Sequence, residues 1–124
     1  MTKSIPEEFL DAIAEKFRLL SDPTRLAILR VLMSGERSVG QVVEETARGQ
    51  ANVSKHLKLL ADSGLVERRK QGLQVFYRIA DPLVEELCQL VCRHLVDSTH
   101  QDVQHKSQLL ERWGRSTPPA GTAP

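Results

Sequence analysis

The chain has 124 residues, of which 40% are hydrophobic and 27% charged, and its net charge at pH 7 is +1. This length predicts one domain, and the composition is typical of a globular protein. The sequence has no apolar stretch of the roughly 18 residues that a membrane span requires, no signal-peptide core, and two cysteines, too few for a disulfide framework. We therefore expect a cytoplasmic protein whose cysteines stay reduced.

Positive charge is concentrated in the middle of the chain. Residues 48–78 hold seven Lys or Arg and two acids, a net charge of +5, whereas the whole chain carries +1. A basic segment between mildly acidic flanks is typical of a surface that binds a polyanion such as a nucleic acid. A solvated charged face has the same composition, so the elements that carry these charges must decide between the two interpretations.

Helical periodicity and a helix-start pattern predict two helices in the first part of the chain. Apolar residues recur at helical spacing across residues 6–20. Asp22 followed by Pro23 is typical of a helix start, because Asp caps free backbone N–H groups and Pro fits the first helical position. The second helix is expected over residues 23–33, where Leu, Ile and Val predominate.

Two further helices are expected on either side of a glycine. Ser38 and Gln41 have the spacing of a capping box, which predicts a third helix of about ten residues that Gly49 ends. The fourth helix is expected over residues 50–63 and stops at Gly64, since glycine is favoured just after a helix. Its buried face is predicted to consist of Val53, Leu57, Leu60 and Ala61.

Two short strands and a long helix are expected next. Residues 65–70 and 74–79 have the character of strands and flank Gln71-Gly72, a pair typical of hairpin turns. Asp81-Pro82 repeats the helix-start pattern of the second helix. A fifth helix is expected to begin there and to run as far as Trp113.

This order of elements predicts a mainly α fold with a small β-hairpin, α-α-α-α-β-β-α. A helix of about ten residues, a short turn and a second amphipathic helix form a helix-turn-helix, and a hairpin directly after it is a wing. The winged helix-turn-helix domain is expected to occupy residues 1–113. The remaining residues, 114–124, are rich in Pro and Gly and are expected to form a disordered tail.

The fourth helix and the wing carry the predicted DNA contacts. Once the apolar residues of this helix are assigned to the core, its outer face has no acid before Asp62 and presents Gln50, Asn52, Ser54, Lys55, His56 and Lys58. Such side chains read base edges in the major groove or bind phosphate. The wing carries three cations next to its turn, which are expected to contact phosphates or the minor groove: Arg68, Arg69 and Lys70.

Two runs of the sequence resemble the ArsR/SmtB family of winged-helix repressors. They are LLSDPTRLAILRVL and QANVSKHLKLLADSGLVERRKQGLQVFYRI, and the similarity covers about residues 10–100. The resemblance implies a homodimer, assembled through the first and fifth helices, that binds a double-stranded DNA operator. It also implies release from DNA by an inducer, which in this family is often a metal or a thiol-reactive species.

The metal sites that the resemblance implies are incomplete in this chain. Many metal-sensing relatives begin the third helix with Cys-x-Cys, where this chain has Ser38-Val39-Gly40-Gln41. A second family site, across the paired fifth helices, is matched by Asp81, His94 and Asp97, while Leu83 stands where a His is expected. Three ligands can hold a divalent metal together with water. In the alternative interpretation Asp81 caps the fifth helix, and His94 and Asp97 lie in solvent.

Cys88 and Cys92 are the candidate thiol sensors. Residues four apart on a helix have Cβ atoms about 5–6 Å apart, too far for an unstrained disulfide but suited to a longer sulfur bridge or an arsenite-like inducer. The alternative is that both cysteines pack as small hydrophobic residues. Sulfur-sensing relatives usually place one cysteine on the second helix, and this chain has none there.

An enzymatic function is not expected. The sequence has no phosphate-binding Gly loop and no metalloprotease or hydrolase motif, and neither Cys88 nor Cys92 can meet His94 within one helix. The alternative to a DNA-binding regulator is a winged helix that binds a protein partner without DNA. The basic fourth helix and wing favour DNA.

Overall fold

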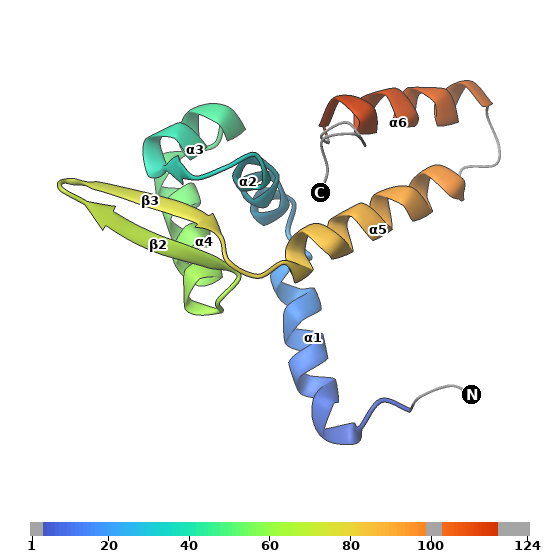
Figure 1. Cartoon of the computed structure of the whole chain (residues 1–124), viewed down its shortest axis with the longest axis horizontal. Coiled ribbons are helices and arrows are strands. Elements are labelled where there is room, and N and C mark those ends of the chain that lie inside the picture. Colours follow the sequence, from blue (N-terminus) through green and yellow to red (C-terminus); the bar gives the residue numbers. More distant parts are fainter. Residues whose placement is uncertain (1–3, 99–102, 117–124) are drawn as a thin grey trace. The chain divides into compact units, whose positions relative to one another are not determined.

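The computed structural model describes residues 4–98 and 103–116, which fall into two compact units on either side of the Val84–Glu85 bond. A single 3₁₀ turn at Glu7–Phe9 leads into the helices and strands of Figure 1. In chain order these are α1 (Leu10–Leu19), α2 (Pro23–Met33), β1 (Arg37–Ser38), α3 (Val39–Thr46), α4 (Gln50–Asp62), β2 (Val66–Gln71), β3 (Gln74–Ile79), α5 (Leu83–Asp97) and α6 (Val103–Ser116).

The predicted starts of α2 and α3 are confirmed. The Asp22 carboxylate accepts a hydrogen bond from the backbone N–H of Arg25 at 3.0 Å, and Pro23 occupies the first turn of the helix. The Ser38 hydroxyl accepts from the backbone N–H of Gln41 at 3.2 Å, and the Gln41 side chain accepts from the backbone N–H of Ser38 at 2.9 Å. These bonds satisfy backbone N–H groups that have no partner within the helix, so the local sequence determines where α2 and α3 begin.

The turn between α3 and α4 differs from the prediction. α3 ends at Thr46, and Ala47 adopts the left-handed conformation, with a φ of +56°. This conformation costs a non-glycine residue about 1 kcal/mol, so packing around the turn must compensate. Gly49, expected to end α3, is instead the extended residue that precedes α4. Gly64 has its expected left-handed conformation after α4, with a φ of +83°.

The wing belongs to a three-stranded antiparallel sheet in the order β1-β3-β2, one strand more than predicted. Strand β1 has two residues, too few for any alternation to be visible in the sequence. β2 and β3 stay paired until Gln71 faces Gln74, so the turn is Gly72-Leu73, one residue later than expected. Gly72 has a φ of +62° and Leu73 has no positive φ, which is the pattern of a type II′ turn.

The core lies where α2, α3 and α4 pack against one another and against the sheet. Its buried residues are Leu19, Ile28, Leu29, Leu32, Val42, Val53, Leu57, Leu60, Leu65, Val66, Tyr77 and Val84. Three of these come from α4, as predicted, and Ala61 packs against them half-buried. Because one face of α4 is held in the core, the opposite face is presented to solvent.

The prediction of one long helix to Trp113 is wrong. α5 ends at Asp97, and a separate helix, α6, begins at Val103. The Ser98 hydroxyl donates to a backbone carbonyl of the last turn of α5. Asp and Ser side chains compete with the helix for backbone partners, which favours an end at this point.

The expected carboxy-terminal tail is partly helical. α6 extends to Ser116, so residues 114–116 are helical, whereas the disorder expected for residues 117–124 falls outside the described residues. In the described ranges, no helix combines the length and the apolar character that crossing a membrane demands.

Candidate nucleic-acid interface

The outward face of α4 is polar and has no acid before Asp62. The predicted contact residues that are exposed on it are Gln50, Asn52, Ser54, Lys55 and Lys58. Gly49 precedes the helix, and no side chain caps its first turn. An acid-poor helix N-terminus attracts anions, because the free N–H groups and the helix dipole both favour negative charge there.

His56 does not belong to this exposed face, contrary to the prediction. Its side chain is 12% exposed, and its Nδ1 lies 3.3 Å from a guanidinium nitrogen of Arg25. A guanidinium only donates, so Nδ1 is the acceptor. The physical reason lies in helix geometry: His56 is three residues after Val53 and four before Leu60, both buried, and therefore lies on the edge of the buried face.

Arg25 is the buried cation that His56 contacts, and it is 8% exposed. Its Nε donates to the carbonyl of Leu19 at 2.7 Å, and Nη2 donates to the carbonyl of Arg18 at 3.0 Å. These carbonyls belong to the last turn of α1, where a cation is also favoured by the helix dipole. One side chain therefore joins the end of α1, the start of α2 and the middle of α4.

The three cations of the wing are not equivalent. Arg69 donates to both carboxylate oxygens of Glu36, at 2.7 and 3.0 Å, and its guanidinium lies 4.9 Å from the centre of the Phe76 ring. The hydrogen bond between Arg69 and Glu36 lowers the pKa of Glu36 and raises the pKa of Arg69. Arg68 and Lys70 are exposed on alternate positions of β2, and neither forms an ion pair with any described residue.

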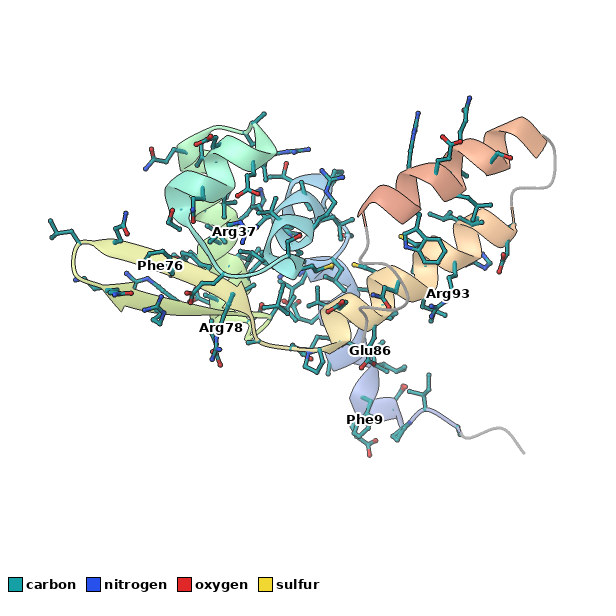
Figure 2. The ribbon with its side chains drawn as sticks, turned by 45° about the horizontal axis from the view of Figure 1, so that its top comes forward. Phe9, Arg37, Phe76, Arg78, Glu86 and Arg93 are labelled. Carbon is teal, nitrogen blue, oxygen red and sulfur yellow. The ribbon has the colours of Figure 1, made fainter. Side chains whose placement is uncertain are left out.

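The remaining cations of α4 and the wing also divide into those with an acidic partner and those without one. Lys58 lies 3.0 Å from the carboxylate of Asp62, and Arg78, labelled on the wing in Figure 2, donates to Glu67 at 2.8 Å. Lys55 has no acidic partner in the described ranges. Lys55, Arg68 and Lys70 therefore keep their full positive charge for a ligand, whereas a neighbouring acid partly neutralises Lys58, Arg69 and Arg78.

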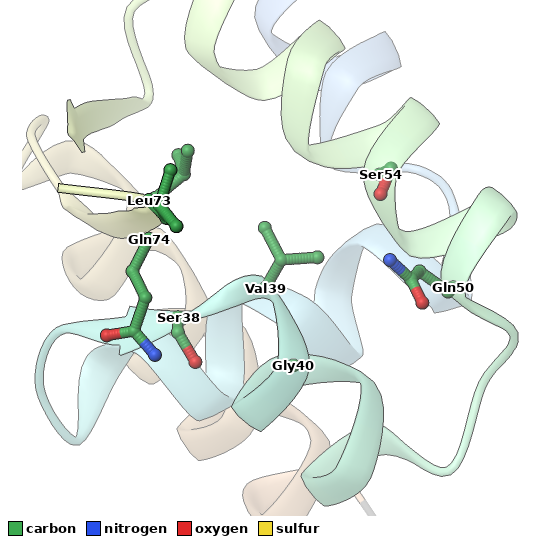
Figure 3. Close-up of a pocket in the computed structure, with 8 residues that line it drawn as sticks. Ser38, Val39, Gly40, Gln50, Ser54, Leu73 and Gln74 are labelled. Atoms are coloured by element: carbon green, nitrogen blue, oxygen red, sulfur yellow. The ribbon is translucent and has the colours of Figure 1, made fainter. Parts of the chain in front are cut away.

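An open groove of about 350 Å³ lies between α4 and the tip of the wing (Figure 3). It is lined by Ser38, Val39 and Gly40 at the start of α3, by Gln50 and Ser54 on α4, and by Leu73, Gln74 and Val75 on the wing. The structure thus brings two predicted contact residues of α4 to the same concavity as the wing tip. A helix and a hairpin that border one concavity can engage the same duplex.

Leu73 and Gln74 were not among the predicted site residues, because charge was the signal that pointed to the wing contacts. Leu73 has a relative exposure of 102%. The available signal was an apolar residue inside a tight turn, a position where polar residues are usual. The position of Ser38 next to the wing depends on the pairing of β1 with β3, which no local pattern indicates.

The candidate metal ligands have ordinary structural surroundings. The Asp81 carboxylate accepts from the backbone N–H of Leu83 at 3.0 Å, at the start of α5, and lies 4.0 Å from the ammonium of Lys16. His94 and Asp97 are exposed on α5. Within one copy of the described chain, no three His, Cys, Asp or Glu side chains gather closely enough to hold a metal. A site shared between two copies stays a prediction.

Cys88 and Cys92 are both half-buried on α5. Burial raises the pKa of the Cys88 thiol, and the neighbouring Cys92 adds to this effect. The thiolate is the reactive form of cysteine, so a raised pKa reduces the reactive fraction at neutral pH. This environment favours the packing role of Cys88 over a sensing role.

This chain is similar to known proteins in sequence and in fold. The model of the arsR family of bacterial regulatory proteins matches residues 22–68. A probable mercury resistance operon repressor from Streptomyces lividans is 39% identical over 89 residues, which are 72% of this chain and 71% of that protein. The crystal structure of the transcriptional repressor BigR from Xylella fastidiosa has a TM-score of 0.64 and 33% identity, covering 68% of this chain and 87% of that chain.

A solution structure from Mycobacterium bovis, a homodimeric winged helix-turn-helix DNA-binding domain, has a TM-score of 0.64 and 33% identity, covering 82% of this chain and 94% of that chain. The family match begins at Asp22, the cap of α2, and ends at Arg68 on the wing, so it contains the whole helix-turn-helix. The chain therefore belongs to the ArsR family of bacterial regulatory proteins, as a DNA-binding transcriptional repressor with a winged helix-turn-helix fold.

Proposed function

We propose that α4 binds in the major groove of a double-stranded DNA operator while the wing contacts the flanking backbone, and that this binding represses the adjacent gene. The observation that carries the proposal is the acid-poor face of α4, which borders the same groove as the wing tip. Repression then follows from occupancy, because a protein bound over a promoter excludes the transcription machinery.

On α4, the proposed base contacts come from the amino-terminal half of the helix. Gln50 and Asn52 carry amides that both donate and accept, the pattern that matches adenine in the major groove. Lys55 reaches guanine or phosphate, and Ser54 suits phosphate. Lys58 is a weaker candidate because its ammonium is already paired with Asp62.

On the wing, the proposed contacts divide into direct and supporting ones. Arg68 and Lys70 would contact phosphates, releasing counterions and contributing affinity that falls with salt. Arg69 would act indirectly, since its guanidinium is bound to Glu36 and holds β2 against the segment that precedes β1.

The DNA-bound form is proposed to be a homodimer formed through α1 and α5. α1 and the turn before it expose two aromatic residues, Phe9 at 56% and Phe17 at 59%, and α5 exposes Leu90 and Val91. Exposed apolar side chains that gather on helices are typical of surfaces that become buried on association. A two-fold dimer presents two copies of α4 to half-sites about 34 Å apart, one turn of DNA.

An inducer that releases the DNA is part of the proposal, and two groups of residues are proposed to bind it. Asp81, His94 and Asp97 are the proposed ligands of a divalent metal shared across the dimer, and Cys88 and Cys92 are the proposed site of a thiol-reactive or arsenite-like inducer. Two observations favour structural roles over inducer binding. The Asp81 carboxylate already accepts a hydrogen bond at the start of α5, and the burial that raises the pKa of the Cys88 thiol is typical of a packed cysteine.

The proposal is tested by selecting duplexes that the protein retains from a random-sequence library and placing the enriched sequence upstream of a reporter gene. We expect enrichment of a sequence with two-fold symmetry, tight binding to it, and lower reporter expression when the protein is present. Retention of no duplex above background would contradict DNA binding and would favour a winged helix that binds a protein partner.

A further inference from the structure

The tip of the wing exposes an apolar side chain where charge and polarity would keep a hairpin soluble. Leu73, with a relative exposure of 102%, is the most exposed large hydrophobic residue of the described chain. It occupies the second position of the two-residue turn, at the point of the hairpin that extends furthest from the core (Figure 1). Leu73 contributes nothing to the core, so the fold alone does not explain a leucine there.

The residues around Leu73 are polar and positively charged. Lys70 and Arg68 precede the turn on β2, and residues 68–80 contain no acid. The local charge is therefore complementary to a phosphate backbone, whereas an apolar protein partner would gain little from two unpaired cations.

Gln71 adds an oriented hydrogen-bond donor at the same tip. Its side-chain oxygen accepts a hydrogen bond from Arg69 at 2.8 Å. Because the guanidinium has only donors, the oxygen must be the atom that faces it, and the Gln71 amide NH₂ is left for other partners. A·T pairs present only acceptors in the minor groove, whereas G·C pairs add a donor there. An amide donor therefore favours A·T pairs.

Taking the proposed DNA binding as its basis, we propose that Leu73 inserts into the minor groove beside the operator and partly unstacks one base step in A·T-rich DNA. The minor groove is about 6 Å wide, too narrow for a two-stranded ribbon but wide enough for the side chain at the point of a turn. Apolar wedges of this kind kink the duplex, and the kink brings more DNA surface to the protein. Gln71 selects the A·T pair, while Lys70 and Arg68, which share one face of the hairpin, hold neighbouring phosphates.

The test uses the duplex selected by the protein, with the fluorescent analogue 8-vinyladenine placed in turn at each adenine position that flanks the α4 contacts; its vinyl group lies on the major-groove side, so the minor groove keeps the pattern of an A·T pair. Unstacking raises the fluorescence of this base. We expect a rise at one step in each half-site on binding of the wild-type protein, and no rise at saturating Leu73→Ala. Affinity for the duplex should fall about three- to thirtyfold in Leu73→Ala. The variant loses the burial of apolar atoms, but it no longer has to unstack the bases, which offsets part of the loss. Leu73→Met should restore both signals.

Two controls separate this insertion from ordinary contact. Arg68→Ala should lower the affinity and keep the fluorescence rise at saturation, because it removes a phosphate contact only. Replacing the A·T pair at the affected step by inosine·cytosine keeps the minor-groove pattern and gives the major groove the pattern of a G·C pair, without the thymine methyl. Binding should persist on that duplex, and its loss would show that this base pair is read in the major groove, which would overturn the proposal.

Tight binding without a fluorescence rise at any flanking position also overturns the insertion and leaves the proposed repressor function intact. If no duplex is retained at all, the proposed function itself fails, and the role of Leu73 fails with it.

Discussion

Asp22 shows how a single carboxylate links the fold to pH. The hydrogen bond from the backbone N–H of Arg25 lowers the pKa of Asp22 more than the loss of hydration raises it, and the positive charge of Arg25 lowers it further. A depressed pKa in the folded state means that the bond stabilises the protein above the unfolded-state pKa, about 3.9 for Asp, and that this stability is lost as pH falls through the folded-state value.

We therefore predict that wild-type stability falls as pH is lowered from 6 to below the unfolded-state pKa of Asp, about 3.9, and that Asp22→Asn shows a smaller loss over the same range. Asn still caps a helix but carries no proton-dependent charge. Urea unfolding at several pH values measures this. Asp11→Asn, an exposed change of the same kind on α1, is the control and should follow the wild type. Identical pH profiles for Asp22→Asn and the wild type would contradict the prediction.

Cys88 permits a second test at the level of one residue. Because burial raises the pKa of its thiol, we predict that Cys88 in a Cys92→Ser variant reacts with iodoacetamide at pH 7 more slowly than free cysteine does, with a rate that increases steeply above pH 8. Mass spectrometry of the modified peptide measures the rate. A rate at pH 7 equal to that of free cysteine would restore Cys88 as a strong sensor candidate.

Arg25 connects three helices, and its loss is predicted to affect all of them. Arg25→Ala leaves the last carbonyls of α1 without their buried donors, which should cost about 2–4 kcal/mol of folding stability. Arg25→Lys should recover less than half of this, since an ammonium cannot reproduce the forked geometry of the guanidinium.

Chemical unfolding of the variants measures this prediction. Arg30→Ala, an exposed substitution on the same helix, should change stability by less than about 0.5 kcal/mol. Equal stability of Arg25→Ala and Arg30→Ala would show that the bonds of Arg25 to α1 contribute nothing to the fold.

At the level of helices and strands, the sequence predicted those boundaries that depend on neighbouring residues in the chain. The starts of α2 and α3 depend on capping residues within three positions, and Gly64 ends α4 through its own conformation, so all three were predictable. The buried face of α4 followed from periodicity. The pairing of β1 with β3 and the left-handed Ala47 were not predictable, because contacts distant in sequence impose them.

The sequence predicted which elements carry the cations of the site, but it did not predict which of these cations have acidic partners. Lys55, Arg68 and Lys70 remain without acidic partners in the described ranges, whereas Arg69 meets Glu36, a residue 33 positions away in sequence. Such a partner cannot be assigned before the sheet order is known. His56 was misplaced for a different reason, since it lies at the boundary between the two faces of α4, where periodicity alone is ambiguous.

At the scale of the whole molecule, the exposed aromatic residues of α1 predict association. Phe17→Glu places a charge where the proposed dimer buries a ring, and we expect a folded monomer with DNA affinity reduced by at least a factor of ten. Sedimentation velocity gives the mass, and circular dichroism confirms the fold. Leu26→Glu, at a less exposed apolar position on α2, is the control and should remain dimeric. A dimeric Phe17→Glu would exclude this face of α1 from the interface.

The most direct test of the DNA-binding surface compares two triple variants that lose the same net charge. One replaces the cations without acidic partners, Lys55, Arg68 and Lys70, by Ala, and the other replaces the paired cations, Lys58, Arg69 and Arg78. The measurement is the dependence of affinity for the selected duplex on salt concentration. The first variant should lose close to three units of slope per protomer, at about 0.9 for each phosphate contact, and the second less than one. Equal losses, or a first variant with the wild-type slope, would contradict the assignment of this surface to DNA.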